Sequence, residues 1–177
     1  MKTFFTVKFA LLPLAIFIIL AAYGLPAPAV VAGLIVSIIV AAWRLRSGEI
    51  KNLELAVVVI FAALCVGLFL FPDVVRTEAI ALAFVGLTAY ATATVILGRP
   101  WTAEFSRGAY PGAASSPVFV RINMILSAFW AALFLLIAVA EELNGGLFVK
   151  TAIVAIGAVA SIYGPKLLIK AFGVERG

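Results

Sequence analysis

Long runs of apolar residues, separated by short polar segments, form the main pattern of this chain. A helix that crosses a membrane needs about 20 mostly apolar residues, and six runs approach or reach that length. The pattern predicts spans over residues 3–23, 26–43, 53–71, 77–97, 118–140 and 147–169. The sequence therefore predicts an all-α membrane protein, a polytopic bundle of about six transmembrane helices that forms one integral membrane domain over residues 1–177.

Prolines mark the ends of several predicted spans. Pro26 begins the second span, where a missing N–H costs no hydrogen bond. Pro13 is expected to kink the first span, and Pro165 to break or kink the end of the last. The N-terminal segment also resembles a secretory signal, but cleavage would leave only fourteen residues before Arg44, too few for a span. We therefore expect an uncleaved first helix, and a polar loop over residues 44–52 after the second.

Composition supports the assignment to a membrane. Hydrophobic residues make up 66% of the chain, and its mean hydropathy is +1.24. A soluble domain is about 45–50% apolar, so the bilayer must be the solvent of this chain. The net charge of +5 does not indicate a nucleic-acid partner, because the charges lie singly at the ends of the apolar runs. That arrangement is typical of topology determinants and of attraction to anionic lipid headgroups.

The distribution of charge predicts the orientation in the membrane. With the N-terminus inside, Arg76 and Lys150 alone among the thirteen basic residues fall on the outer side, which leaves eleven inside. Four acidic residues join them outside, Asp73, Glu78, Glu141 and Glu142. Basic residues concentrate on the cytoplasmic side of membrane proteins. The sequence therefore predicts a multi-pass membrane protein with both termini in the cytoplasm.

Residues suited to catalysis are scarce. The chain has no His and a single cysteine, Cys65, which excludes an internal disulfide, a haem held by two His and a zinc site of Cys/His type. Glu104 and the pair Glu141–Glu142 are predicted on opposite faces of the bilayer, so they cannot act together, and no nucleophile lies beside a base. We therefore predict no enzyme, no catalytic or metal-binding residue and no cofactor.

The longest break in hydrophobicity follows the fourth predicted span. Trp101 and Phe105 lie four residues apart, which predicts a short interfacial helix over residues 101–107 with its aromatic side in the lipid and Thr102 as a weak N-cap. Arg99 and Arg107 can then face lipid phosphates. Two interpretations stay open: a plain re-entry loop, or a surface that docks lipid headgroups or a partner protein.

A polar stripe lies on one face of the fifth predicted span. Asn123, Ser127 and Trp130 follow at i, i+4 and i+7, and a polar stripe in a membrane faces the bundle. It either bonds a neighbouring helix or forms a binding site. Thr88 and Thr92 share a face of the fourth span. They either bond carbonyls or neighbouring helices, or line a path for a neutral solute or lipid together with the stripe.

Small residues lie along one side of the last predicted span. Gly157, Ser161 and Gly164 form a ridge that lets another helix approach closely. The ridge serves helix packing, either within the bundle or between two copies of the chain.

Four blocks of the sequence carry a resemblance to a known family. They are LLPLAIF (11–17), AAWRLRSGEI (41–50), GRPWTAEFSR (98–107) and the spacing Pro117, Phe119, Asn123, Trp130. In these the chain resembles the intracellular septation protein A family, the YciB-like inner-membrane proteins. The family usually has a Trp-Lys pair near the fourth span and Trp-x-x-Phe-Lys at the start of the last. Here Arg76 and Phe148-Val149-Lys150 stand in similar places, which indicates a distant relative.

The resemblance implies a non-enzymatic inner-membrane protein that supports cell-envelope integrity or septation through protein and lipid contacts. The alternative is a small-solute or lipid transporter or channel with a polar path between the fourth and fifth spans. The expected partners are anionic lipid headgroups, other envelope or division membrane proteins and a second copy of the chain, and no nucleic acid is expected.

Overall fold

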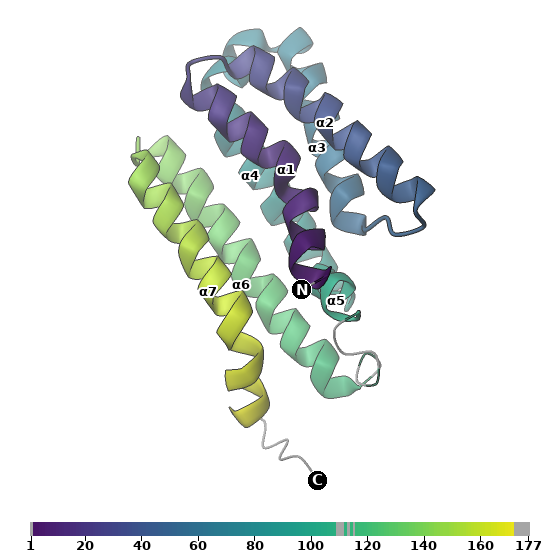
Figure 1. Ribbon diagram of the computed structural model, residues 1–177. Helices are drawn as coiled ribbons and strands as arrows, with labels where there is room; N and C mark the ends of the chain where they lie inside the picture. Colours follow the sequence, from purple (N-terminus) through teal and green to yellow (C-terminus); the bar gives the residue numbers. More distant parts are fainter. Residues whose placement is uncertain (1, 109–111, 113, 115, 172–177) are drawn as a thin grey trace. The chain divides into compact units, whose positions relative to one another are not determined.

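The structure is a computed structural model that describes residues 2–108, 112, 114 and 116–171. Its helices are α1 (Lys2–Ala22), α2 (Pro26–Arg46), α3 (Asn52–Leu70), α4 (Pro72–Ile96), α5 (Trp101–Ser106), α6 (Pro117–Glu142) and α7 (Leu147–Ala171) (Figure 1). No β-strand occurs in the part of the chain that the structure describes.

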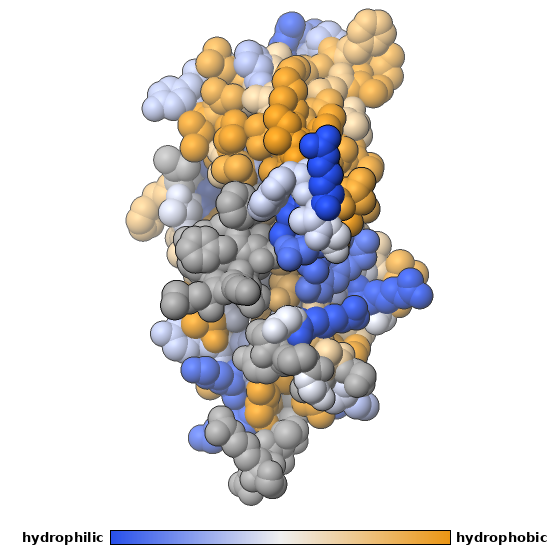
Figure 2. All heavy atoms as spheres, turned by 45° about the vertical axis from the view of Figure 1, so that its right-hand side comes forward, coloured by the Kyte–Doolittle hydropathy of each residue, from blue (hydrophilic) through white to orange (hydrophobic). Residues whose placement is uncertain are grey.

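Among the residues that the structure describes, five helices are long and apolar enough to cross a membrane. They are Pro26–Arg46, Asn52–Leu70, Pro72–Ile96, Pro117–Glu142 and Phe148–Ala171. In α1, the apolar helical stretch found among the described residues is shorter and covers Ala10–Ala22. Large hydrophobic side chains are exposed along these helices, and Figure 2 shows broad apolar areas on one face of the molecule. The prediction of an all-α, multi-pass membrane protein is confirmed.

Several helix ends differ from the predicted boundaries, and two differ by three residues or more. α2 continues to Arg46, past the predicted end of the second span at residue 43, and α4 begins at Pro72 rather than at residue 77. A proline at the start of α4 is well placed because the first N–H groups of a helix have no partner within it. Pro165 does not break the last helix, since α7 runs through it to Ala171, and the alternative of a kink at Pro165 stays a prediction. Membrane helices tolerate an internal proline where the freed carbonyl finds another donor.

The chain divides into two compact units, and the first comprises Met1–Leu87. Its core contains Phe17 and Phe61, which are fully buried and meet edge to face with ring centroids 5.2 Å apart. Gly33 of α2 makes room for the Phe61 ring, because a Cβ at this glycine would lie 2.5 Å from Phe61 Cε1. Small residues allow such close approach of helices in membranes.

A buried ion pair joins the end of α2 to the start of α3. Arg44 Nε donates to Glu54 Oε1 at 2.9 Å, and Arg44 Nη1 donates to Glu49 Oε2 at 2.7 Å. The second oxygen of Glu54 accepts the backbone N–H of Lys51 at 2.9 Å, so one carboxylate both caps α3 and holds α2. The expectation that residues 44–52 form a plain polar loop is therefore wrong at Arg44, which is buried within α2.

The second unit comprises Thr88–Gly177, and in it α7 packs against α6. A Cβ at Gly157 would lie 2.7 Å from Trp130 Cη2, so the glycine lets the indole lie against the backbone of α7. Trp130 Nε1 donates to Ser161 Oγ at 2.9 Å. A Cβ at Gly164 would lie 3.3 Å from Leu126 Cδ2. The small residues predicted to form a ridge on α7 thus face α6 of the same chain.

The turn between α6 and α7 is closed by an ion pair. Lys150 Nζ of α7 donates to Glu141 Oε2 of α6. Between them Asn144 has φ 53, a left-handed conformation that Asn adopts more readily than most residues. The pair fixes the register in which the two longest helices of this unit begin to pack.

Candidate functional site

The segment between α4 and α6 begins with a tight turn. Gly98 has φ +65, and the Arg99 N–H bonds the carbonyl of Thr94 at 2.9 Å. A glycine in this left-handed conformation is the usual way to close a helix. Pro100 then stands at the N-cap position of α5 with no side-chain hydrogen bond. The prediction that Thr102 caps this helix is wrong, because its hydroxyl bonds α6 instead.

Hydroxyl groups fasten α5 to the polar stripe of α6. Thr102 Oγ1 lies 2.9 Å from Asn123 O, which accepts its proton, and 2.9 Å from Ser127 Oγ. Ser106 Oγ donates to Asn123 Oδ1 at 3.2 Å, and Asn123 Nδ2 donates to the Phe119 carbonyl at 2.9 Å. Asn123 is only 2% exposed and Ser127 is fully buried. The stripe is therefore covered and bonded by α5.

Aromatic rings form the second half of this contact. Trp101 is 6% exposed and Phe105 is 7% exposed, and their rings meet edge to face at 5.9 Å. The Trp101 ring also lies 6.3 Å from Trp130 and stacks on Phe134 at 6.5 Å. The prediction that Trp101 and Phe105 face the lipid is wrong. The Trp101 ring packs against Phe105 and against two aromatic residues of α6, which stabilises it beyond area burial alone.

Three basic residues near α5 are exposed. Arg99 precedes α5 and Arg107 follows it, and both are exposed. Arg121, near the start of α6, is exposed as well. Residues 99–107 therefore turn their aromatic and hydroxyl groups inward and leave guanidinium groups at the surface. The interaction of Arg99 and Arg107 with lipid phosphates stays a prediction.

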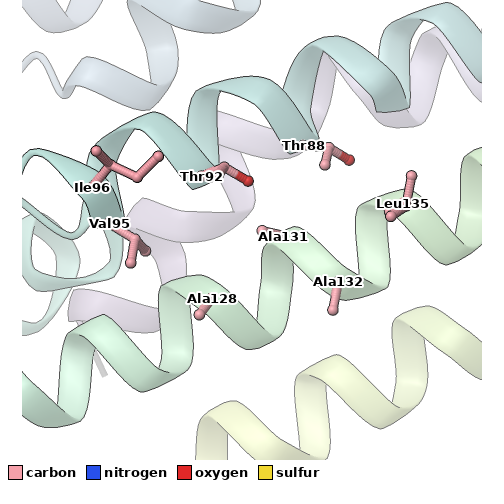
Figure 3. Close-up of a pocket in the computed structure, with 8 residues that line it drawn as sticks. All are labelled: Thr88, Thr92, Val95, Ile96, Ala128, Ala131, Ala132 and Leu135. Atoms are coloured by element: carbon pink, nitrogen blue, oxygen red, sulfur yellow. The ribbon is translucent and has the colours of Figure 1, made fainter.

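A hollow lies between the last turns of α4 and the middle of α6, with a volume of about 260 Å³ (Figure 3). Its lining is apolar apart from two hydroxyls: Thr88, Thr92, Val95, Ile96, Ala128, Ala131, Ala132 and Leu135. Thr88 and Thr92 thus line a space, as one predicted interpretation requires. Asn123 and Ser127 do not line it, so the structure does not bring the four residues of the predicted path together.

One residue of the site, Ser106, was not predicted from the sequence, and Thr102 was predicted only as an N-cap. Thr102 and Ser106 bond the polar stripe, and their spacing of four matches that of Asn123 and Ser127. Two polar pairs with equal helical spacing on neighbouring helices are a recognisable signal for a hydrogen-bonded contact. This spacing is present in the sequence, but the aromatic residues of the same short helix favoured a lipid contact instead.

Removing the Thr102 hydroxyl is expected to loosen α5. In Thr102→Val the hydrogen bonds to Asn123 and Ser127 are lost, which costs about 1 kcal/mol and raises the open population about fivefold. Ala103 is buried on α5, so Ala103→Cys in a Cys65→Ala background reports opening by its rate of maleimide labelling. We expect a rate about fivefold higher in Thr102→Val.

Thr94→Val is the matched control, because Thr94 Oγ1 bonds the Ala91 carbonyl of its own helix. It should leave the labelling rate unchanged. An equal rate in Thr102→Val and in the parent would show that the hydroxyl contacts do not hold α5.

The chemistry of this contact is that of amides, hydroxyls and indoles. Among the residues that the structure describes, no three His, Cys, Asp or Glu gather to hold a metal ion. The arrangement can position α5 and present its flanking arginines. No protein-family model, no curated protein and no solved structure matches the chain.

Proposed function

We propose that this chain is a non-enzymatic protein of the bacterial inner membrane that supports envelope integrity or septation through protein and lipid contacts. One observation carries the proposal: α5 is fixed on α6 by hydroxyl and aromatic contacts while Arg99 and Arg107 stay exposed at its ends. A segment of fixed geometry between two membrane helices can present a constant surface to a partner. The resemblance to the YciB-like family supports the cellular setting.

The charges favour anionic groups as part of what is bound. Arginine forks bind phosphate and carboxylate in a bidentate manner, and they serve lipid headgroups and acidic protein surfaces alike. In the proposed orientation both termini and α5 lie on the cytoplasmic side, where anionic lipids attract basic segments. An active alkaline phosphatase fused to the C-terminus would contradict this orientation.

Photocrosslinking in cells tests the proposed contact. A photoreactive residue replaces Arg107, which is exposed beside α5, and in a matched control it replaces Arg46, which is exposed at the end of α2. We expect discrete protein adducts from position 107 and none of the same mass from position 46. Adducts to lipid alone at position 107 would remove the support for a protein partner at this surface.

A small-solute or lipid transporter is the second candidate function, and the hollow between α4 and α6 favours it. Thr88 and Thr92 supply hydroxyls within an otherwise apolar lining. Against a continuous polar path, Asn123 and Ser127 are used by α5. A scrambling assay with fluorescent phospholipid in liposomes examines the lipid version, and labelled lipid that never changes leaflet would argue against it.

A further inference from the structure

We infer that the hollow between α4 and α6 binds one acyl chain of an anionic glycerophospholipid whose phosphate is held by Arg99 and Arg121. This inference goes beyond the proposed function, because a bound lipid is compatible with a scaffold and with a transporter. It rests on the shape of the hollow, on the faces of the two helices and on the position of the two arginines.

The walls of the hollow are made of small side chains. Ala128 and Ala132 of α6 stand four residues apart, and Thr88 and Thr92 of α4 have the same spacing, so each pair lies along one helix face. Figure 3 shows the threonine side chains extending from α4 and the alanines on α6 across the hollow. Ala128, Ala132 and Thr92 are exposed, so the hollow opens to the surroundings. At this depth the surroundings are hydrocarbon.

Basic residues lie at one end of the hollow. On α6, Ala128, Ala132 and Leu135 follow Arg121 by 7, 11 and 14 residues, so all four share one face. Arg121 then lies about 10 Å along the helix from Ala128. On the opposite wall, Arg99 follows Ile96 by three residues through the turn at Gly98. Both arginines therefore lie beyond the same end of the apolar walls, at the end of α4 and the start of α6.

These spacings match a phospholipid. The headgroup layer of a bilayer is roughly 5–8 Å thick on each side. A phosphate near Arg121 therefore brings the acyl chains of the same molecule to the level of Ala128. Along the hollow, the guanidinium groups come first and the apolar walls follow. An anionic lipid has the matching order, with its phosphate first and its acyl chains after it.

The size of the hollow suits an alkyl chain. A volume of about 260 Å³ corresponds to roughly eight or nine water molecules. A slender alkyl chain fits between the walls. It makes van der Waals contacts with the lining atoms, which would have no partners if the space were empty.

Lipid titration of the purified full-length protein tests this inference. Native mass spectrometry measures how many copies retain phosphatidylglycerol or phosphatidylcholine. The double variant Ala128→Leu/Ala132→Leu fills the hollow and should weaken binding of both lipids at least tenfold. The double variant Arg99→Gln/Arg121→Gln should weaken phosphatidylglycerol about 25-fold, about fivefold for each arginine, and weaken phosphatidylcholine much less, because the choline ammonium of that lipid offsets the charge of its phosphate.

Two matched controls use exposed residues of α7. Ala158→Leu adds the bulk of one of the two leucines, and Lys166→Gln/Lys170→Gln removes the same charge. Both should bind phosphatidylglycerol as the parent does. The two kinds of variant thus separate the acyl chain from the phosphate.

Three results would overturn the inference. One is undiminished lipid binding in the double leucine variant. Another is an equal loss of both lipids in the double glutamine variant. The third is a disulfide between two copies in Ala132→Cys on a Cys65→Ala background, which would place a second chain at the hollow. None of these results bears on the protein adducts from position 107, so the proposed function is judged separately.

Discussion

Replacing Arg44 with alanine is expected to lower the free energy of unfolding by about 3–5 kcal/mol. Arg44 and Glu54 are both buried, and their charges lie 2.9 Å apart. Removing the guanidinium leaves the Glu54 carboxylate buried without its opposite charge, and that uncompensated charge is the main cost. SDS titration in mixed micelles, followed by tryptophan fluorescence, measures the change.

Arg46→Ala is the control for this variant. Arg46 follows Arg44 by two residues in α2 and is exposed, so its loss should change the free energy of unfolding by less than about 0.5 kcal/mol. Arg44→Lys should recover part of the loss, since an ammonium keeps the charge but cannot reach both carboxylates with one planar fork. A loss below about 1 kcal/mol in Arg44→Ala would mean that the pair contributes no more than a surface salt bridge.

Replacing Phe61 with alanine is expected to cost about 3–5 kcal/mol. The ring is fully buried, meets Phe17 edge to face and lies in the space that Gly33 leaves open. Its removal leaves a cavity among three helices of the first unit, and the loss combines lost contacts with that cavity. The same unfolding titration in SDS measures the effect.

Phe69→Ala makes a strict comparison, because Phe69 is on the same helix but is 87% exposed. A lipid-facing ring loses little when it is shortened, since lipid tails are as apolar as the ring. We expect less than about 1 kcal/mol for Phe69→Ala. Similar losses in the two variants would indicate that Phe61 is not part of a packed core.

The membrane helices were predictable because hydrophobicity is a local property. A long run of apolar residues indicates by itself that the segment lies in lipid, and polar or proline residues mark where the run ends. The short helix at residues 101–106 was predictable for the same reason, from the spacing of Trp101 and Phe105. Its orientation was not, because it depends on Trp130 and Phe134, which lie on another helix.

The buried ion pair escaped prediction for a related reason. Arg44 and Glu54 stand at the ends of neighbouring apolar runs, where charges ordinarily face water or headgroups. Hydropathy gives the depth of a residue along a helix but not the direction in which its side chain points. The same limit explains why Thr88 and Thr92 lie apart from Asn123 and Ser127, since the rotation of each helix about its axis depends on packing.

The charges at the ends of α6 also define the thickness of membrane that suits this protein. Residues 122–140, between Arg121 and Glu141, carry no charge and span about 28 Å as a helix. That length is close to the roughly 30 Å of hydrocarbon in a typical bilayer. Because Glu141 is paired with Lys150, α7 is held at the same depth as α6. A thicker bilayer would therefore have to thin around both helices together, and the cost would favour residence in a thin membrane.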